Sequence, residues 1–157
     1  MHANEKLIND FYGAFQKGDG DAMAACYHDD ATFRDPVFPN LSSTEVKAMW
    51  RMFCSGEVEV KVEYSDVSCT ESDGRGHWEA HYPFRTTGRP VHNCIDAAFT
   101  FKDGKILTHV DTFPFWKWTR MALGAPGLLL GWTPLVRKKV QGLAKKSLDE
   151  FIAKQDA

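Results

Sequence analysis

A chain of 157 residues fits one domain with a sizeable core and is short for two. Hydrophobic residues make up 43% of it and charged residues 25%, which is the composition of a globular protein. The formal net charge is −2, and no array of basic residues interleaved with aromatic residues appears, so nucleic-acid binding has no support.

Three helices are predicted in the first third of the chain. Asn4 can cap the first of them, and its apolar residues recur at helical spacing: Leu7, Ile8, Phe11 and Phe15. A shorter helix is expected from Asp21 to Tyr27. The stretch Ser42-Ser43-Thr44-Glu45 is a good helix start, because a serine and a glutamate three residues later can cap each other's backbone amides.

Five strands are predicted around and after these helices. A short one runs from Ala31 to Arg34, because Pro36 lacks an N–H and forces the preceding residue into an extended conformation. From Glu57 to Tyr64 the apolar period is two, which indicates a strand with one wet face. Another should span His77 to Arg85. The strands 91–101 and 106–115 form a hairpin, since the pair Asp103-Gly104 between them is a strong turn signal.

The order of these elements, helices first and an antiparallel meander after them, predicts an α+β fold with three helices on one face of a bent sheet. After Trp116 the pattern changes, because an apolar stretch broken by Gly and Pro leads to a basic amphipathic helix from Leu135 to Lys154. We expect residues 1–116 to form the domain and residues 117–157 its C-terminal helical extension.

The balance of acidic and basic residues also changes after Trp116. Residues 1–116 hold 11 Lys and Arg against 18 Asp and Glu, whereas residues 117–157 hold 8 against 3. A solvated helix face is the commoner cause of such a split, and binding to an anionic membrane surface is the alternative. The residues that favour the alternative are Trp116, Trp118, Met121, Leu123, Leu128 to Leu130, Arg137 to Lys139, Lys145 and Lys146. If this segment packs on its own domain or on a sister subunit, the protein will ignore anionic liposomes.

Expectations about the cellular compartment and about cofactors rest on sequence patterns that this chain lacks. The start MHANEKLINDFYGAF lacks the features of a secretory signal, and no apolar run reaches the ~20 residues of a membrane span, so we expect a cytoplasmic protein. No C-x-x-C pair occurs among Cys26, Cys54, Cys69 and Cys94, so we predict reduced thiols, no metal site and no cofactor. His77 and His81 share a strand face but lie ~13 Å apart, too far to chelate one metal.

The stretch YHDDATFRDPVFP places Asp35 among bulky apolar neighbours. Two interpretations are open. Asp35 begins a turn before Pro36, as Asp-Pro pairs often do. Alternatively its carboxyl lines an apolar pocket, where burial raises its pKa toward that of a useful base.

Two longer patterns carry a family resemblance. FYGAFQKGDGDAM followed by YHDDATFRDPVF, and the closing hairpin FTFKDGKILTHVDTF, resemble the nuclear-transport-factor-2-like superfamily, which includes SnoaL-like polyketide cyclases, ketosteroid isomerase and limonene epoxide hydrolase. The resemblance covers Asn4 to Phe115. It implies a cone-shaped sheet, a homodimer and a small hydrophobic ligand, but it is weak for function, because one fold hosts many activities.

Only part of the ketosteroid isomerase site has matching residues in this sequence. It places Asp35 in the position of the isomerase's aspartate base. The tyrosine that donates to the developing oxyanion falls on Phe11, which has no hydroxyl, and Tyr12 is expected to point about 100° around the helix. The protonated acid falls on Ala97, and the neighbouring Asp96 should lie on the opposite strand face. Steroid isomerase chemistry is therefore disfavoured.

The closing hairpin offers a second candidate. GKILTHVD resembles in spacing the strand on which limonene epoxide hydrolase carries a catalytic aspartate, and the matching residue is Asp111. His109 lies two residues earlier on the same face, so the pair could activate a water by general-base chemistry. The competing interpretation is a polar pair that satisfies itself by hydrogen bonding.

Aromatic residues on the same faces could line a ligand cavity or simply form the core: Phe11, Phe15, Phe33, Trp50, Trp78, Tyr82, Phe99 and Phe113. We therefore predict a pocket protein that acts as a base-assisted isomerase, cyclase or hydrolase on a small hydrophobic metabolite, with Asp35 or the pair His109 and Asp111 as base. The alternative is a non-catalytic ligand-binding or dimerisation module, because Phe11 stands where a hydroxyl would be needed.

Overall fold

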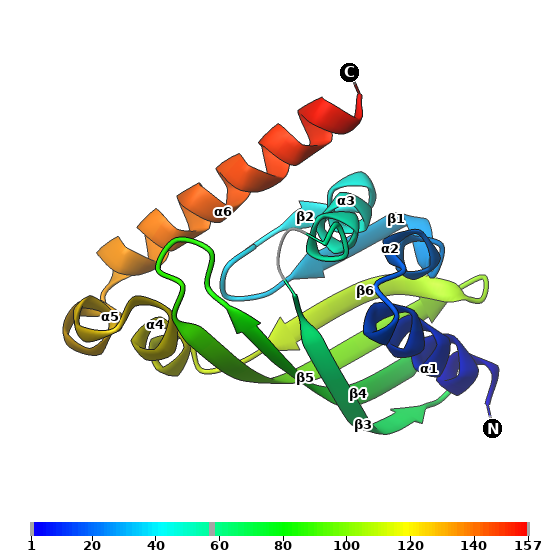
Figure 1. Ribbon diagram of the computed structural model, residues 1–157. Helices are drawn as coiled ribbons and strands as arrows, with labels where there is room; N and C mark the ends of the chain where they lie inside the picture. Colours follow the sequence, from blue (N-terminus) through cyan, green and yellow to red (C-terminus); the bar gives the residue numbers. More distant parts are fainter. Residues whose placement is uncertain (1, 57–58, 157) are drawn as a thin grey trace.

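The structure is a computed structural model that describes residues 2–56 and 59–156. Its centre is one curved, open sheet of six strands in the order β2-β1-β6-β5-β4-β3 (Figure 1). The strands are β1 (Tyr27–Arg34), β2 (Leu41–Ser42), β3 (Lys61–Cys69), β4 (Asp73–Pro83), β5 (Pro90–Lys102) and β6 (Lys105–Thr112). The predicted α+β class is confirmed, with one correction. The sheet is mixed, because β1 enters beside the last strand and runs parallel to β6, while the other pairs are antiparallel.

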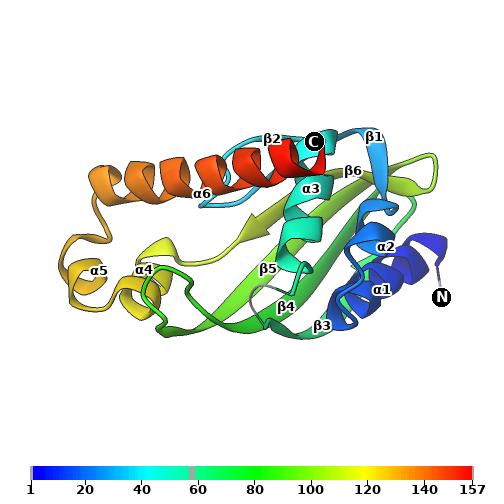
Figure 2. The same cartoon turned by 45° about the horizontal axis from the view of Figure 1, so that its top comes forward.

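Three helices cover one face of this sheet, as predicted (Figures 1 and 2). They are α1 (Ala3–Gln16), α2 (Gly20–Ala24) and α3 (Ser43–Phe53). The capping box predicted for the third helix is present, since the Ser42 hydroxyl accepts from the Glu45 N–H and the Glu45 carboxylate accepts from the Ser42 N–H.

The cap predicted for the first helix is wrong. His2 caps α1, because its Nδ1 accepts from the Asn4 N–H at 3.0 Å. Asn4 lies inside the helix, and its side-chain amide donates to the carbonyls of Thr70 and Glu71, each at 3.0 Å. These partners lie 66 and 67 residues away in sequence, so a local pattern could not reveal them.

Several strand boundaries also differ from the prediction. The second helix ends at Ala24 rather than Tyr27, and β1 begins at Tyr27 instead of Ala31. Of the strand predicted from Glu57, the first two residues lie outside the described part of the chain, and β3 begins at Lys61. The final strand stops at Thr112, because Pro114 is the N-cap of the next helix. The hairpin turn is confirmed, with positive φ at both Asp103 and Gly104.

The C-terminal extension forms three further helices, α4 (Phe115–Leu123), α5 (Ala125–Leu130) and α6 (Pro134–Gln155). The apolar stretch after Trp116, in which no helix was predicted, holds the first two. α4 and α5 lie at one end of the sheet, and α6 returns beside α3 (Figure 2). An ion pair of 2.9 Å between Lys145 and Glu45 joins these two helices. No helix among the described residues combines the length and the apolar character needed to cross a membrane.

The contact between α4 and α5 depends on a glycine. A Cβ added at Gly127 would overlap the backbone carbonyl of the fully buried Thr119. We expect Gly127→Ala to lower the free energy of unfolding by about 1–3 kcal/mol, because backbone must shift to admit the methyl group. The matched control is Gly142→Ala in α6, where nothing lies within 4 Å of the new Cβ and helix propensity should add about 1 kcal/mol of stability. Urea unfolding measures both, and equal effects would contradict the packing described.

Candidate functional site

The inner face of the sheet carries a buried polar cluster in an aromatic core. β6 places His109 and Asp111 there, with only 1% and 3% of their surface exposed. His109 Nε2 lies 2.8 Å from Asp111 Oδ1. On its other side, His109 Nδ1 lies 2.8 Å from the hydroxyl of Tyr27. That hydroxyl in turn accepts from the Trp50 indole N–H at 2.8 Å.

The direction of each bond follows from the donors available. An indole N–H can only donate, so the Tyr27 hydroxyl accepts from Trp50 and is left to donate to His109 Nδ1. The Asp111 carboxylate can only accept, so His109 Nε2–H donates to it. Burial keeps Tyr27 in its phenol form, since it raises the pKa of this group well above the usual value. The cluster is therefore a chain of hydrogen bonds from Trp50 through Tyr27 and His109 to Asp111.

Two polar atoms at this site have no hydrogen-bond partner within the described chain. One is the second carboxylate oxygen of Asp111, Oδ2, since Oδ1 accepts from both His109 and the Trp78 indole at 3.4 Å. The other is the hydroxyl of Tyr12. Buried polar groups without partners are rare in folded proteins, and catalytic sites are one place where they occur. The two atoms are therefore candidates for substrate or water contacts.

Strand pairing relates these two atoms to each other. Asp111 pairs with Ala97 on β5, and Ala97 pairs with Gly76 on β4. The Tyr12 ring lies over Gly76, where an added Cβ would be 3.7 Å from the hydroxyl oxygen. The two small residues thus form the floor between the Asp111 carboxylate and the Tyr12 hydroxyl. Burial raises the pKa of Tyr12 well above its usual value, and the nearby charge of Asp111 adds to the effect.

The position of Tyr12 corrects an expectation. Both Phe11 and Tyr12 are buried, at 0% and 1% exposure, because the face of α1 that meets the sheet is wide enough to take both. Phe11 packs edge-on against the rings of Tyr27, Trp50 and His109, and Tyr12 stacks on Tyr64. The buried face of α1 therefore carries a hydroxyl at Tyr12, next to the position at which the sequence has Phe11.

Asp35 directly follows the last residue of β1. Arg34 pairs in parallel with Val110, so the next residue of each strand, Asp35 and Asp111, lies at the same level on the inner face. Asp35 Oδ1 accepts from the backbone N–H groups of Val37 at 2.7 Å and Phe38 at 2.6 Å. Asp35 thus makes the predicted turn, and it is also a half-buried carboxyl whose pKa burial raises to about 7. The turn is therefore confirmed, whereas the lining of a ligand pocket by this carboxyl stays a prediction.

The C-terminal extension closes the site near Asp35. The Trp118 indole of α4 donates to the hydroxyl of Tyr82 at 2.8 Å, and burial raises the pKa of Tyr82 to about 12. The Gln141 amide of α6 donates to the carbonyl of Pro36 at 3.0 Å. Packing of the extension on its own domain was one of the alternatives that the sequence left open, but these partners could not be identified from it, since they lie 36 and 105 positions apart.

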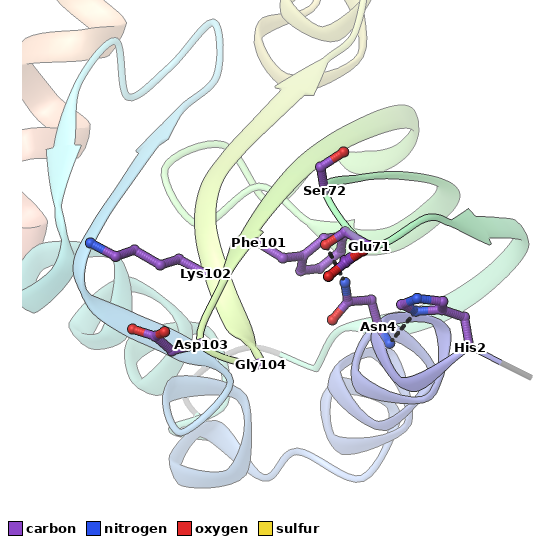
Figure 3. A pocket seen from close by; sticks show the side chains of 8 residues that line it. All are labelled: His2, Asn4, Glu71, Ser72, Phe101, Lys102, Asp103 and Gly104. Carbon is purple, nitrogen blue, oxygen red and sulfur yellow. Dashed lines mark hydrogen bonds between the residues drawn. The ribbon is translucent and has the colours of Figure 1, made fainter.

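The predicted pocket-lining residues pack against one another on this face. Phe15 and Trp50 lie 5.1 Å apart between ring centroids, and Phe33 lies 4.9 Å from His109. Seven of the eight are buried and Tyr82 is half-buried; the full set is Phe11, Phe15, Phe33, Trp50, Trp78, Tyr82, Phe99 and Phe113. Two pockets are found elsewhere. One lies beside the N-terminus and the β5–β6 turn, around Asn4, Phe101 and Asp103 (Figure 3).

The second pocket lies on the sheet's other side, around Arg75, His77 and Asp96. Asp96 occupies that side as its strand alternation predicts, and Ala97 stands where the resemblance to ketosteroid isomerase would have an acid.

Comparisons with known proteins agree with this architecture. A family model described as "SnoaL-like domain" matches residues 8–109. An epoxide hydrolase of M. tuberculosis, described as LEH-like, superposes with a TM-score of 0.63 at 20% identity, covering 85% of this chain and 95% of that one. A putative polyketide cyclase of Xanthomonas campestris pv. campestris has a TM-score of 0.63 at 17% identity, covering 76% and 96%.

A protein of Catenulispora acidiphila with a ketosteroid isomerase-like fold, in complex with trimethylamine, has a TM-score of 0.65 at 14% identity, covering 82% and 98%. At these identities the structural likeness establishes the fold alone. A search among curated proteins found no match.

Proposed function

The chain belongs to the SnoaL-like domain family, and from this premise we propose that it is a general acid–base enzyme for a small hydrophobic substrate. The reaction class is isomerisation, cyclisation or hydration. Asp35 is the base, and Asp111 and Tyr12 are the polar groups that contact the reacting atoms. His109, Tyr27 and Trp50 hold Asp111 in place.

The observation that carries this proposal is the carboxyl of Asp35. It is half-buried at the same level as Asp111, and its pKa is raised to about 7. A base that works near neutral pH needs such a pKa, because it must both take up and return a proton. Two superposed proteins are described as an epoxide hydrolase and a putative polyketide cyclase, and both reaction types use acid–base groups of this kind.

The remaining polar groups suit the charge changes of such a reaction. In isomerisation or cyclisation, the Asp35 carboxylate takes a proton from a carbon next to a carbonyl group. The Tyr12 hydroxyl then donates to the oxygen on which negative charge develops. In isomerisation, protonated Asp35 returns the proton to a second carbon. In cyclisation, the enolate carbon bonds to an electrophilic carbon of the same substrate, and protonated Asp35 gives its proton to the oxygen that this step leaves negatively charged.

In hydration of an epoxide, Asp35 takes one proton of a water whose other hydrogen is accepted by Asp111 Oδ2. The water oxygen bonds to a ring carbon as the carbon–oxygen bond of the ring breaks, and protonated Asp35 gives its proton to the ring oxygen.

Substrate enters at the end of the sheet that the extension covers. The bonds from Trp118 to Tyr82 and from Gln141 to Pro36 tie α4 and α6 to that end. Aromatic side chains occupy the space beyond, so entry requires the extension to move.

This dense aromatic packing favours a second candidate, a non-catalytic binding or dimerisation module. Phe11, Tyr12 and Trp50 are each exposed by 1% or less. In that case the chain of hydrogen bonds from Trp50 to Asp111 serves only the stability of the core.

A screen followed by turnover measurements separates the two candidates. Thermal-shift assays with hydrophobic carbonyl compounds, lactones and epoxides identify the ligand class. We expect turnover of the stabilising compounds to be lost in Asp35→Asn and in Asp111→Asn. Asp29→Asn, on the same strand but with a side chain that is 96% exposed, should keep it. Turnover that survives both inner-face substitutions would overturn the proposed mechanism, and ligand binding without turnover would favour the second candidate.

The Tyr12 hydroxyl allows a test that needs no substrate. We expect Tyr12→Phe to leave the free energy of unfolding unchanged or to raise it by about 1 kcal/mol, because the hydroxyl has no protein partner to lose. The matched change Tyr27→Phe removes two hydrogen bonds and leaves the Trp50 N–H and His109 without their partner, so it should cost about 1–3 kcal/mol. Urea unfolding measures the free energy of unfolding of both variants. A larger loss in Tyr12→Phe than in Tyr27→Phe would contradict the absence of a hydrogen-bond partner for the Tyr12 hydroxyl.

A further inference from the structure

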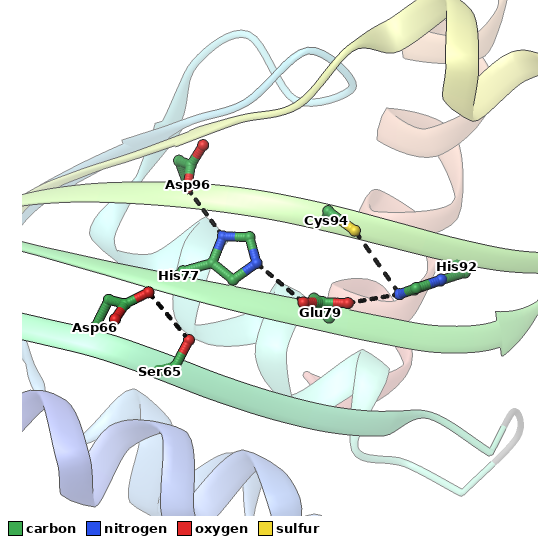
Figure 4. Close-up of polar contacts among 7 residues, drawn as sticks. All are labelled: Ser65, Asp66, His77, Glu79, His92, Cys94 and Asp96. Carbon is green, nitrogen blue, oxygen red and sulfur yellow. Dashed lines mark hydrogen bonds and ion pairs between the residues drawn. The ribbon is translucent and has the colours of Figure 1, made fainter.

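The outer face of the sheet carries a second cluster of ionisable groups, opposite the aromatic core. β4 and β5 are antiparallel neighbours, and their register sets His77 opposite Asp96, Glu79 opposite Cys94, and His81 opposite His92. All six side chains point away from Trp78 and Ala80, since strand residues alternate between faces. In Figure 4 the Glu79 carboxylate lies between His77 and His92, with Asp96 beside His77 and Cys94 beside His92.

Three of these groups place ligand atoms around one point. Glu79, His92 and Cys94 each offer one atom, and these atoms all lie within 4.8 Å of one another. His92 Nε2 is 2.7 Å from Glu79 Oε1 and 3.7 Å from Cys94 Sγ. In a tetrahedral zinc site with bonds of about 2.0–2.3 Å, nitrogen and sulfur ligands lie ~3.6 Å apart. The His92 and Cys94 pair already has this spacing, and the Glu79 oxygen has only to move outward by a few tenths of an ångström.

A fourth side chain holds the carboxylate in position. His77 Nε2 lies 3.1 Å from Glu79 Oε2, the oxygen that faces away from His92, and His77 Nδ1 lies 2.9 Å from Asp96 Oδ1. Metal-binding carboxylates are commonly oriented by such outer hydrogen bonds, which fix the ligand and tune its basicity. The chain from Asp96 through His77 to Glu79 therefore supplies the support that a metal site needs.

The types of ligand atom also suit a cation, because a carboxylate oxygen, an imidazole nitrogen and a thiol sulfur meet at one point. A bound cation would displace the Cys94 thiol proton and release it to solvent.

We propose that Glu79, His92 and Cys94 bind one divalent zinc ion on the outer face of the sheet, with a water as the fourth ligand. A thiolate, an imidazole and a carboxylate together favour Zn²⁺ over the oxygen-preferring Mg²⁺ and Ca²⁺. The sequence predicted no metal site, because it has no C-x-x-C pair and because His77 and His81 are too far apart along one strand. The ligands are instead brought together across two strands, 13 and 15 positions apart in sequence.

Metal titration of the full-length chain tests this proposal. Zn²⁺ is titrated in a phosphine reductant against a chromophoric chelator, and Co²⁺ serves as the spectroscopic probe, because a cobalt–thiolate bond gives a near-ultraviolet charge-transfer band. We expect one metal ion per chain. Cys94→Ser should abolish the cobalt band, and His92→Gln and Glu79→Gln should weaken zinc binding about 10- to 100-fold. The control is Cys54→Ser, because Cys54 is a half-buried thiol that donates to the sulfur of Met23. This substitution should change neither the cobalt band nor the affinity for zinc.

A measurement on the unaltered chain guards against variants that fail to fold. Bound Zn²⁺ should protect Cys94 from alkylation by iodoacetamide, read by peptide mass spectrometry, and leave the reactivity of Cys54 unchanged. The proposal is overturned by an absence of stoichiometric binding, by a cobalt band that persists in Cys94→Ser, or by equal alkylation of Cys94 with and without zinc.

A separate observation concerns the end of the molecule formed by α5 and the start of α6. Five large apolar side chains there, which we call the apolar tip, are 48–79% exposed: Leu128, Leu129, Leu130, Trp132 and Leu135. The segment 117–148 around them holds seven Lys and Arg and no Asp or Glu. Lys138 and Lys139 follow Leu135 by three and four residues, so they share its face of α6 and are exposed like it.

The geometry points to an anionic lipid surface as the partner of the apolar tip. Leucine and tryptophan side chains enter the interface of a bilayer while adjacent lysines contact lipid phosphates. A twofold contact with a second copy would bring each patch against itself and set Lys138 and Lys139 against the same residues of the other copy. The lipid surface instead complements both the apolar and the basic part.

Vesicle co-sedimentation tests this second proposal. We expect the chain to bind vesicles of phosphatidylcholine with phosphatidylserine and to ignore phosphatidylcholine alone. The double variant Leu129→Asp with Trp132→Asp should weaken binding at least about tenfold. Leu143→Asp, equally exposed at 54% but outside the apolar tip, should not. No binding of the unaltered chain to anionic vesicles, or a dimer in analytical ultracentrifugation that the double variant dissociates, would overturn it.

Discussion

Replacing His109 with alanine should lower the free energy of unfolding by about 3–5 kcal/mol. His109 is 1% exposed and is the only described residue that bonds both Tyr27 and Asp111. Its removal leaves the Asp111 carboxyl, itself 3% exposed, with a single long bond from Trp78 at 3.4 Å. The Tyr27 hydroxyl loses its acceptor as well. Urea unfolding monitored by tryptophan fluorescence measures the loss.

The matched control is His81→Ala, because His81 is exposed on the outer face, where its ring stacks on that of His92. Its free energy of unfolding should change by less than about 0.5 kcal/mol. A loss below about 1 kcal/mol in His109→Ala would mean that water enters and solvates Asp111, and the chain of hydrogen bonds would then not be a buried structural unit.

Local patterns predicted the parts of the fold that local physics determines. The capping box at Ser42 and Glu45 and the turn at Asp103 and Gly104 each depend on residues a few positions apart, and both are present. The start of β1 was missed, because Tyr27 was predicted to end a helix and its strand partner Ile106 lies 79 positions away on β6.

In the candidate site, too, only the features that depend on residues close in sequence could be predicted. Strand alternation placed His109 and Asp111 on one face, and the structure pairs them. Their partner Tyr27 lies 82 residues from His109 in sequence, so no pattern in either segment could indicate the bond. Tyr12 was set aside because it follows Phe11 by about 100° around the helix, but the buried face of α1 is wide enough to include both residues.

The inner and outer clusters both receive side chains from β4, because these alternate between the two faces of the sheet. Trp78 and Ala80 on β4 face the core, and the alternate residues His77 and Glu79 face outward, so a single strand contributes to both. The inner cluster is desolvated, which makes an unpaired atom costly and therefore informative about function. The outer cluster is partly hydrated, which makes its ion pairs individually weak. Its significance lies in the convergence of different ligand types rather than in stability.

Asp35→Asn is expected to raise stability and abolish turnover together. The pKa of Asp35 is about 7 in the folded chain and near 3.8 when unfolded. Below pH 4 the carboxyl is protonated in both states, so the substitution changes little. As pH rises from 4 to 7, only the unfolded state ionises, and the native carboxyl loses stability relative to asparagine. Above pH 7 the difference is constant, at about 2 kcal/mol for a half-buried group.

The asparagine oxygen can still accept from Val37 and Phe38, so the turn itself should persist. Urea unfolding at pH 4, 6 and 8 measures the trend, with Asp29→Asn as a control that should show none. Turnover of any substrate found should fall by about 10²- to 10⁴-fold, the usual contribution of a general base. A carboxyl that lowers stability at neutral pH is consistent with the proposed role of Asp35 in proton transfer. A stability difference independent of pH would mean that Asp35 is already ionised in the folded chain and serves only the turn.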